Sequence, residues 1–113
     1  MMSWMWMFFA LLMAHALTDY AWQPEFMAQW KHPDAFIPPS AGHWTWWMAA
    51  HSLVNGAGVA VVTGSLALGL GETAYHAFLD YGKCVEWWDT STDQECHLVS
   101  KVLWAWLATA WIV

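Results

Sequence analysis

Three side chains of the types that bind metal ions or transfer protons lie four residues apart in the segment 71–83. They are Glu72, His76 and Asp80, and the positions between them hold mostly Ala, Tyr, Phe and Leu. Side chains four residues apart lie on the same face of an α-helix, so these three form one row. The pattern predicts a helix that presents two carboxyl groups and an imidazole to a common pocket.

The other apolar segments carry shorter rows with the same spacing. These rows are His15, Asp19 and Gln23, then His51 and Asn55, and last His97 and Lys101. Imidazole and carboxylate groups are ligands for zinc, iron and manganese. A single such pair is common where the His only packs and hydrogen-bonds, but four rows in one short chain favour a metal site over a purely structural polar network. We therefore predict that a divalent metal is bound by six residues: His15, Asp19, His51, His76, Asp80 and His97.

The composition places these rows in a membrane protein. Of the 113 residues, 59% are hydrophobic and 11% are charged, and the chain contains twelve Trp and seven Met. Typical soluble domains have about 25% charged residues. Ionisable groups inside a membrane are costly and normally face the interior of a helix bundle, where they have a function. The sequence predicts an integral membrane protein, with the lipid bilayer and other membrane proteins as its partners.

Four apolar segments have the length of a membrane crossing, which takes about 20 residues. The expected helices cover about 3–22, 44–62, 66–84 and 94–113 within a single domain, residues 1–113. Prolines between residues 24 and 43 prevent a long helix there. The predicted fold is all-α, a four-helix transmembrane bundle with antiparallel up-down topology.

This topology brings the polar rows to similar depths. Counted from the side of the two long loops, His15, His51 and His76 each lie roughly seven to nine residues in, which is about 10–14 Å at 1.5 Å per residue. Asp19 and Asp80 lie somewhat closer to the loops. Helix bundles build metal sites by projecting such side chains inward from facing helices. We therefore expect one shared pocket between the helices.

Four phrases of the sequence resemble a family of small bacterial and phage integral membrane proteins of unknown function. They are AHALTDYAWQ at 14–23, AHSLVN at 50–55, HAFLDYGK at 76–83 and DQECH at 93–97. In that family, His-x3-Asp-x3-Gln, a second-helix His, His-x3-Asp-x2-Lys and Asp-Gln-x2-His recur on successive helices. The resemblance implies topology, polar motifs and a bacterial inner-membrane location, but no activity, and the Trp enrichment departs from the family's Leu-rich helices. The matching positions are Asp19, Gln23, His51, His76, Asp80, Lys83, Asp93, Gln94 and His97.

Two functions follow as hypotheses. The first is a metal-dependent hydrolase acting on a membrane-embedded substrate. In it, Glu72 or the carboxylate left free by the metal takes a proton from metal-bound water, and Lys83 or Lys101 stabilises developing negative charge. The second is a non-enzymatic accessory subunit of a larger membrane complex. Its Trp-rich surface would pack against partners, and its His residues would bind haem or a pigment in place of a metal ion.

Nucleic acid is excluded as a partner by charge. The net charge is −6, and the three basic residues are too few and too scattered to neutralise a phosphate backbone. Cys84 and Cys96 bracket an acidic loop, either as a disulfide or as two free thiols, and neither has the spacing of a metal finger. No Gly-x-Ser-x-Gly motif supports nucleophilic catalysis.

Overall fold

The computed structural model describes residues 3–110, most of which are helical. A π-helical segment, Leu17–Ala21, continues the first helix, and a short 3₁₀ turn, Pro39–Ala41, precedes the third. No β-strand occurs in the described part of the chain. The α-helices are α1 (Trp4–Ala16), α2 (Glu25–Trp30), α3 (Trp44–Thr63), α4 (Leu66–Cys84) and α5 (Thr90–Ala110).

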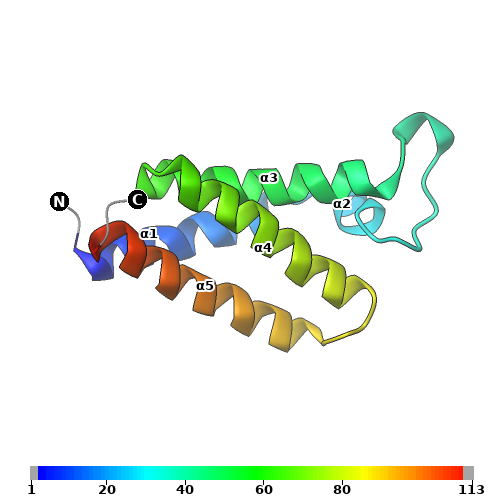
Figure 1. Ribbon diagram of the computed structural model, residues 1–113. Helices are drawn as coiled ribbons and strands as arrows, with labels where there is room; N and C mark the ends of the chain where they lie inside the picture. Colours follow the sequence, from blue (N-terminus) through cyan, green and yellow to red (C-terminus); the bar gives the residue numbers. More distant parts are fainter. Residues whose placement is uncertain (1–2, 111–113) are drawn as a thin grey trace.

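The four long helices run alternately away from and toward the end of the molecule where both termini lie (Figure 1). α3 packs along α4, while α1 contacts both α3 and α5. The short α2 and the α4–α5 loop lie at the opposite end, which we call the loop end. The principal dimensions of 47 × 26 × 21 Å reflect this elongated bundle.

A tight turn joins α3 to α4 and fixes their pairing. Gly64 ends α3 in the left-handed conformation, with a φ of 72°, which favours glycine. The hydroxyl of Ser65 then accepts a hydrogen bond of 3.2 Å from the backbone N–H of Leu68 and caps α4. Farther along, a Cβ on Gly56 would collide with the backbone oxygen of Gly69, so this pair lets the two helix backbones approach closely. The close approach brings the polar row of α3 against that of α4.

Polar contacts join α1 to α3 next to this pair. The hydroxyl of Thr18 lies 2.7 Å from Oδ1 of Asn55 and also 2.8 Å from the backbone oxygen of Ala14. The amide of Asn55 donates in turn to the backbone oxygen of His51. Specific small or polar residues therefore set the facing sides of α1, α3 and α4.

The interior divides into two halves. The half near the termini is a hydrophobic core, and the half near the loop end contains buried polar side chains. The core residues are Met7, Leu11, Val59, Leu68 and Ala105. The two cysteines lie outside this core as free, partly buried thiols.

The predicted all-α fold is confirmed, but the four-helix bundle is wrong, because α2 adds a fifth α-helix to the described part of the chain. α5 begins at Thr90, four residues before the expected start. The last expected helical positions, 111–113, lie outside the described residues.

The membrane prediction is also wrong. Among the helices of residues 3–110, none combines the length with the apolar character that a crossing requires. α1 covers only 13 residues before its π-helical continuation. The longer α3, α4 and α5 are interrupted by the polar rows on their inner faces. The finding overturns the integral membrane location, in the bacterial inner membrane or elsewhere, and both membrane functions, the hydrolase and the complex subunit.

Candidate metal centre

Four ligand-type side chains meet in the polar half of the interior. Asp19 comes from the π-helical segment after α1, His51 from α3, and His76 and Asp80 from successive turns of α4. All four are buried, and His76 and Asp80 have no exposed surface. π-helical turns are frequent at functional sites, and this one carries the only member of the set that does not come from a regular α-helix.

One atom of each side chain converges on a common point. Nε2 of His51 lies 3.0 Å from Oδ1 of Asp19 and 3.3 Å from Oδ2 of Asp80. Nε2 of His76 lies 3.4 Å from each of the same two oxygens. A tetrahedral zinc ion with bonds of about 2.0–2.1 Å separates its ligand atoms by about 3.3–3.4 Å. Three of the four nitrogen–oxygen distances therefore match a tetrahedral metal site, and the fourth, 3.0 Å between His51 and Asp19, is shorter because these two atoms are hydrogen-bonded.

One of these four atoms has no hydrogen bond. Nε2 of His76 is buried without a partner among the described residues, and so is the other nitrogen of the same ring. The remaining three atoms are hydrogen-bonded, two of them to each other and Oδ2 of Asp80 to Lys31. Native proteins rarely leave buried polar atoms unpaired, and an ion at the site is one explanation for such groups. The donor set thus fits a metal ion in chemistry as well as in spacing.

In the metal-free centre, the two buried carboxylates require compensating positive charge. Burial disfavours the charged form of His76, but the carboxylates of Asp19 and Asp80 outweigh it and raise the pKa of His76 to about 9. Burial acts to raise the pKa of Asp19 and Asp80, but the adjacent imidazoles of His51 and His76 outweigh it and hold both pKa values below the usual range. Lys31 adds an ammonium group 2.6 Å from Oδ2 of Asp80. Two ionised carboxylates are thus matched by a proton and a lysine.

The remaining two predicted ligands flank this group. Nε2 of His15 lies 3.2 Å from Oε1 of Gln94 and 3.7 Å from Oδ2 of Asp19. Burial is the main cause that lowers the pKa of His15. The ring of His97 lies 4.4 Å, centre to centre, from that of His76. Burial acts against the charged form of His97 as well, but neighbouring carboxylates raise its pKa.

The two side chains predicted to act in catalysis occupy different settings. Both carboxylate oxygens of Glu72 are engaged, one by the ammonium of Lys101 and the other by the indole N–H of Trp104 at 2.9 Å. Lys83 is partly exposed, and its Nζ lies 3.9 Å from Oδ1 of Asp80. Their assignment as proton acceptor and charge stabiliser stays a prediction.

The predicted metal ligands did not include three residues that contact this cluster, although two of them, Asp93 and Gln94, match motif positions of the resembled family. Lys31, Asp93 and Gln94 are at or near hydrogen-bonding distance of its carboxylates or histidines. Asp93 has the same four-residue spacing to His97 as the pairs in the other rows, and that spacing is a signal for it. Lys31 is one of only three basic residues in the chain, which is the one hint that the sequence offers.

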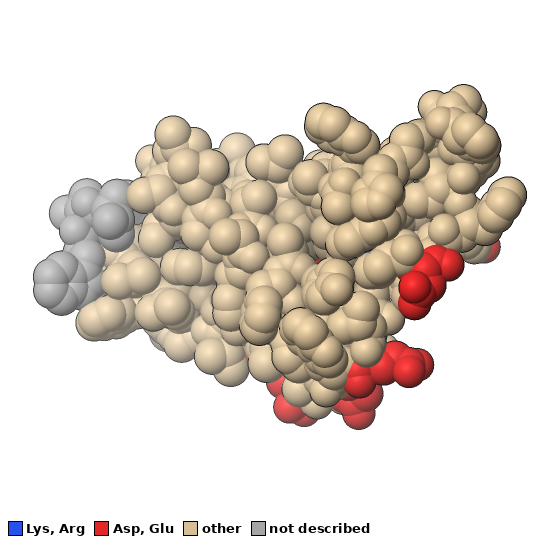
Figure 2. All heavy atoms as spheres, turned by 45° about the vertical axis from the view of Figure 1, so that its right-hand side comes forward, with Lys and Arg blue, Asp and Glu red and all other residues tan. Residues whose placement is uncertain are grey.

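Surface charge concentrates at the end nearest the cluster. Figure 2 shows the acidic residues at the loop end and no basic residue on that face. All three lysines instead contact buried carboxylates. Exposed carboxylates at one end attract cations to it. The exposed acidic residues are Glu25, Asp34, Glu86, Asp89 and Glu95.

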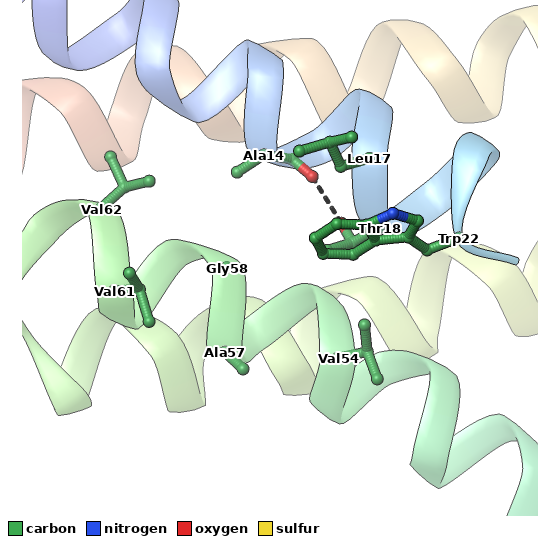
Figure 3. A pocket seen from close by; sticks show the side chains of 9 residues that line it. All are labelled: Ala14, Leu17, Thr18, Trp22, Val54, Ala57, Gly58, Val61 and Val62. Carbon is green, nitrogen blue, oxygen red and sulfur yellow. Dashed lines mark hydrogen bonds between the residues drawn. The ribbon is translucent and has the colours of Figure 1, made fainter.

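An open groove of about 370 Å³ lies between α1 and α3 and is apolar (Figure 3). Leu17, Trp22, Val54 and Val61 contribute to its walls. The hydroxyl of Thr18 is turned toward the backbone of Ala14. The groove contains none of the ligand-type side chains, so the site with identifiable chemistry is the buried centre.

Comparison with curated proteins gave no match, and comparison with solved structures gave none either. A protein-family model matches residues 7–111, a range that contains all the residues of the centre. The match confirms the resemblance to an uncharacterised family, but it carries neither the motifs nor the membrane location that the resemblance implied. The chain belongs to the family described as "Protein of unknown function (DUF3307)".

Proposed function

We propose that the protein binds a divalent transition-metal ion, with zinc as the favoured ion, through Asp19, His51, His76 and Asp80. The observation that carries the proposal is the set of nitrogen–oxygen separations of 3.0–3.4 Å among these four side chains. Zinc takes four nitrogen and oxygen ligands in a tetrahedron. Iron and manganese accept the same ligand types, but octahedral sites need more ligands than this set supplies.

A set of four protein ligands favours a structural metal site over a catalytic one. Structural zinc sites use four protein ligands, whereas catalytic sites keep one position open for water. A bound ion would link the π-helical segment, α3 and α4 through their side chains. Metal binding that depends on the folded arrangement of ligands adds its free energy to that of folding.

Lys31 supports the proposal through its position. Its ammonium contacts Oδ2 of Asp80, one of the four ligand atoms, and this contact is buried. A buried carboxylate pair needs compensating positive charge. Lys31 supplies part of that charge in the metal-free protein, and an incoming divalent ion would replace it. The exposed acidic residues at the loop end would draw the ion toward the same end.

The test is zinc binding by protein that has been stripped with a chelator and then dialysed against zinc. Wild-type protein should bind zinc. His76→Ala should lose the zinc held at this centre, because the variant lacks one of the four proposed ligands, and Nε2 of His76 forms two of the four nitrogen–oxygen pairs. The matched control is His43→Ala, which removes an exposed imidazole outside the cluster. Circular dichroism checks that each variant folds.

Two outcomes would overturn the proposal. One is a wild-type protein that binds no zinc after stripping and reloading. The other is equal zinc content and affinity in wild type and a folded His76→Ala variant. If that variant does not fold, His51→Gln provides a smaller change at the same centre and is read in the same way.

A further inference from the structure

A second group of ligand-type atoms lies on the far side of Asp80. The Oδ2 atom of Asp80 belongs to the four-atom set, but its Oδ1 atom lies 3.6 Å from Nε2 of His97. The same nitrogen lies 3.5 Å from Oδ1 of Asp93. Ligand atoms of these three residues all lie within 4.8 Å of one another. α4 and α5 therefore form a second pocket that shares one carboxylate with the first.

None of these three atoms has a hydrogen-bond partner among residues 3–110. Oδ1 of Asp80, Oδ1 of Asp93 and Nε2 of His97 are all buried without a hydrogen bond. Their residues have no exposed surface. The observation is independent of the first centre, because it concerns different atoms of Asp80 and two residues outside the four-ligand set.

Neighbouring side chains do not account for these unpaired atoms. Gln94 donates to Oδ2 of Asp93 at 3.2 Å, which leaves Oδ1 unoccupied. Nζ of Lys83 lies 3.9 Å from Oδ1 of Asp80 and 3.6 Å from Oδ2 of Asp93, too far for a hydrogen bond in either case. Lys83 therefore balances charge from the rim of the pocket without filling it.

A different grouping of nearby residues is less suitable. Glu72, His76 and His97 also bring ligand atoms within reach of one another. However, both oxygens of Glu72 already bond Lys101 and Trp104. A metal ion there would have to displace Lys101 and Trp104 from both oxygens of one carboxylate, which is expensive, whereas at the first centre it displaces Lys31 from one oxygen of Asp80. The Asp80 Oδ1, Asp93 Oδ1 and His97 Nε2 atoms have no hydrogen bond to break.

We propose that Asp80 bridges two metal ions, the second of which is bound by Asp80, Asp93 and His97. This inference rests on the proposed function, because the bridge requires an ion at the first centre. Paired metal sites in proteins place their ions about 3.5–4 Å apart. Opposite oxygens of one carboxylate, each facing its own set of histidine and aspartate atoms, provide that arrangement.

The second ion would differ from the first in having an open position. It has three protein ligands, and three-ligand zinc sites bind water or another small ligand in the fourth place. Lys83 is the partly exposed residue beside this pocket, so a small anion bound to the ion would meet its ammonium group. The exchangeable ligand is therefore water or a small anion.

Metal stoichiometry after stripping and zinc reloading tests the inference. Wild-type protein and the control His43→Ala should bind two equivalents of zinc. His97→Ala and Asp93→Asn should each bind one tight equivalent, with at least a tenfold loss of affinity for the second. Asp80→Asn should weaken both. Manganese-loaded wild-type protein should also show exchange coupling between two ions in its electron paramagnetic resonance spectrum, and the Asp93→Asn variant should not.

The outcomes separate this inference from the proposed function. One equivalent in wild type that is lost in His76→Ala and kept in His97→Ala would leave the first centre standing and overturn the bridge. Two uncoupled equivalents, both unaffected by Asp93→Asn, would overturn it too. No zinc in wild type would reject both proposals. Asp93→Asn preserves the shape of the side chain, so the test remains decisive if His97→Ala does not fold.

Discussion

Two groups of buried polar side chains lie between the same helices, and they differ in how well their atoms are matched. In the first, the ammonium of Lys101 bonds both Glu72 and the hydroxyl of Ser100, and Trp104 bonds the other oxygen of Glu72. In the second, the Asp19–His51–His76–Asp80 centre, ring nitrogens and a carboxylate oxygen lack partners.

Burial and residue type do not distinguish these groups, because both place carboxylates and cations where water is excluded. The difference is how many of the polar atoms have a hydrogen-bond partner. An ammonium has three donors and an indole one, which is enough to satisfy a single carboxylate and its neighbours. In the centre, Lys31 and the proton on His76 balance the charge of the two carboxylates, but both ring nitrogens of His76 and Oδ1 of Asp80 have no hydrogen-bond partner among the described residues. The comparison teaches that a matched group, whose polar atoms have hydrogen-bond partners, stabilises the fold without a ligand. An unmatched group, in which some atoms lack partners, can accept a cation.

The largest effect is expected from breaking the matched group. Glu72→Ala leaves the buried ammonium of Lys101 without its main partner, and removing one member of a buried ion pair costs about 3–5 kcal/mol. Urea unfolding of the zinc-loaded protein measures this loss. The double variant Glu72→Leu/Lys101→Met removes both charges and should recover most of the stability. A single variant within about 1 kcal/mol of wild type would show that the pair is not structural.

Metal removal should produce the next largest loss of stability. This loss should come only from the unmatched group, the Asp19–His51–His76–Asp80 centre. At a zinc concentration of a thousand times Kd, binding to the folded state alone raises the free energy of unfolding by about 4 kcal/mol. Thermal unfolding with zinc and with chelator measures this increment. It should disappear in His76→Ala and persist in Glu72→Leu/Lys101→Met. An equal increment in the two variants would remove the distinction between the groups.

The rows of polar residues were readable from the sequence because helical periodicity fixes which side chains share a face. Glu72, His76 and Asp80 lie on one face of α4, and the matched spacing on α1 and α3 brings Asp19 and His51 to them. The sequence did not distinguish the matched group from the unmatched one. Glu72 has the same spacing as its neighbours, but its partners Lys101 and Trp104 are on another helix.

The contact between Lys31 and Asp80 was not readable, because Lys31 belongs to none of the polar rows that helical spacing reveals. It depends on α2, a six-residue helix in a proline-containing connection. The membrane prediction failed for a related reason. Average composition counts the apolar outer faces of the helices, whereas a crossing needs a continuous apolar window, which the polar rows interrupt.

A smaller effect is expected in the pH dependence of the stability of the metal-free protein. The folded pKa of His76 is about 9, above its ordinary value of 6.5. The charged groups and imidazoles that face it are Asp19, Asp80, His51 and His97. A raised pKa contributes stability that is fully present below about pH 6.5 and is lost as the pH rises through about 9, with a size on the order of 3 kcal/mol.

Urea unfolding of chelator-treated protein at pH 6 and pH 9.5 measures that loss. His76→Gln should reduce it, because the titrating imidazole is gone. Zinc should reduce it in wild type, because the metal binds the deprotonated ring. A wild-type protein without any loss over this range would mean that the carboxylates of Asp19 and Asp80 do not hold a proton on His76.

The smallest expected effect concerns a residue that supports the centre without binding the ion. The amide of Gln94 donates to Oδ2 of both Asp19 and Asp93, at 3.2 Å in each case. It thereby orients one carboxylate from each of the two proposed metal sites. Loss of such a partner reduces metal affinity about 10–100-fold, or about 1.4–2.7 kcal/mol. Gln94→Ala should lower zinc affinity by this amount in calorimetric titration and leave the fold intact.

Gln23→Ala is the matched control for Gln94→Ala. Its amide bonds only the backbone oxygen of Asp19, at 3.4 Å, so the carboxylate keeps its orientation and the affinity should not change. If Gln94→Ala weakens both zinc equivalents, one amide positions ligands of both pockets, and the unmatched group behaves as a single unit. If both glutamine variants bind zinc like wild type, Gln94 does not orient the carboxylates. The histidines of the centre then hold them in place without it.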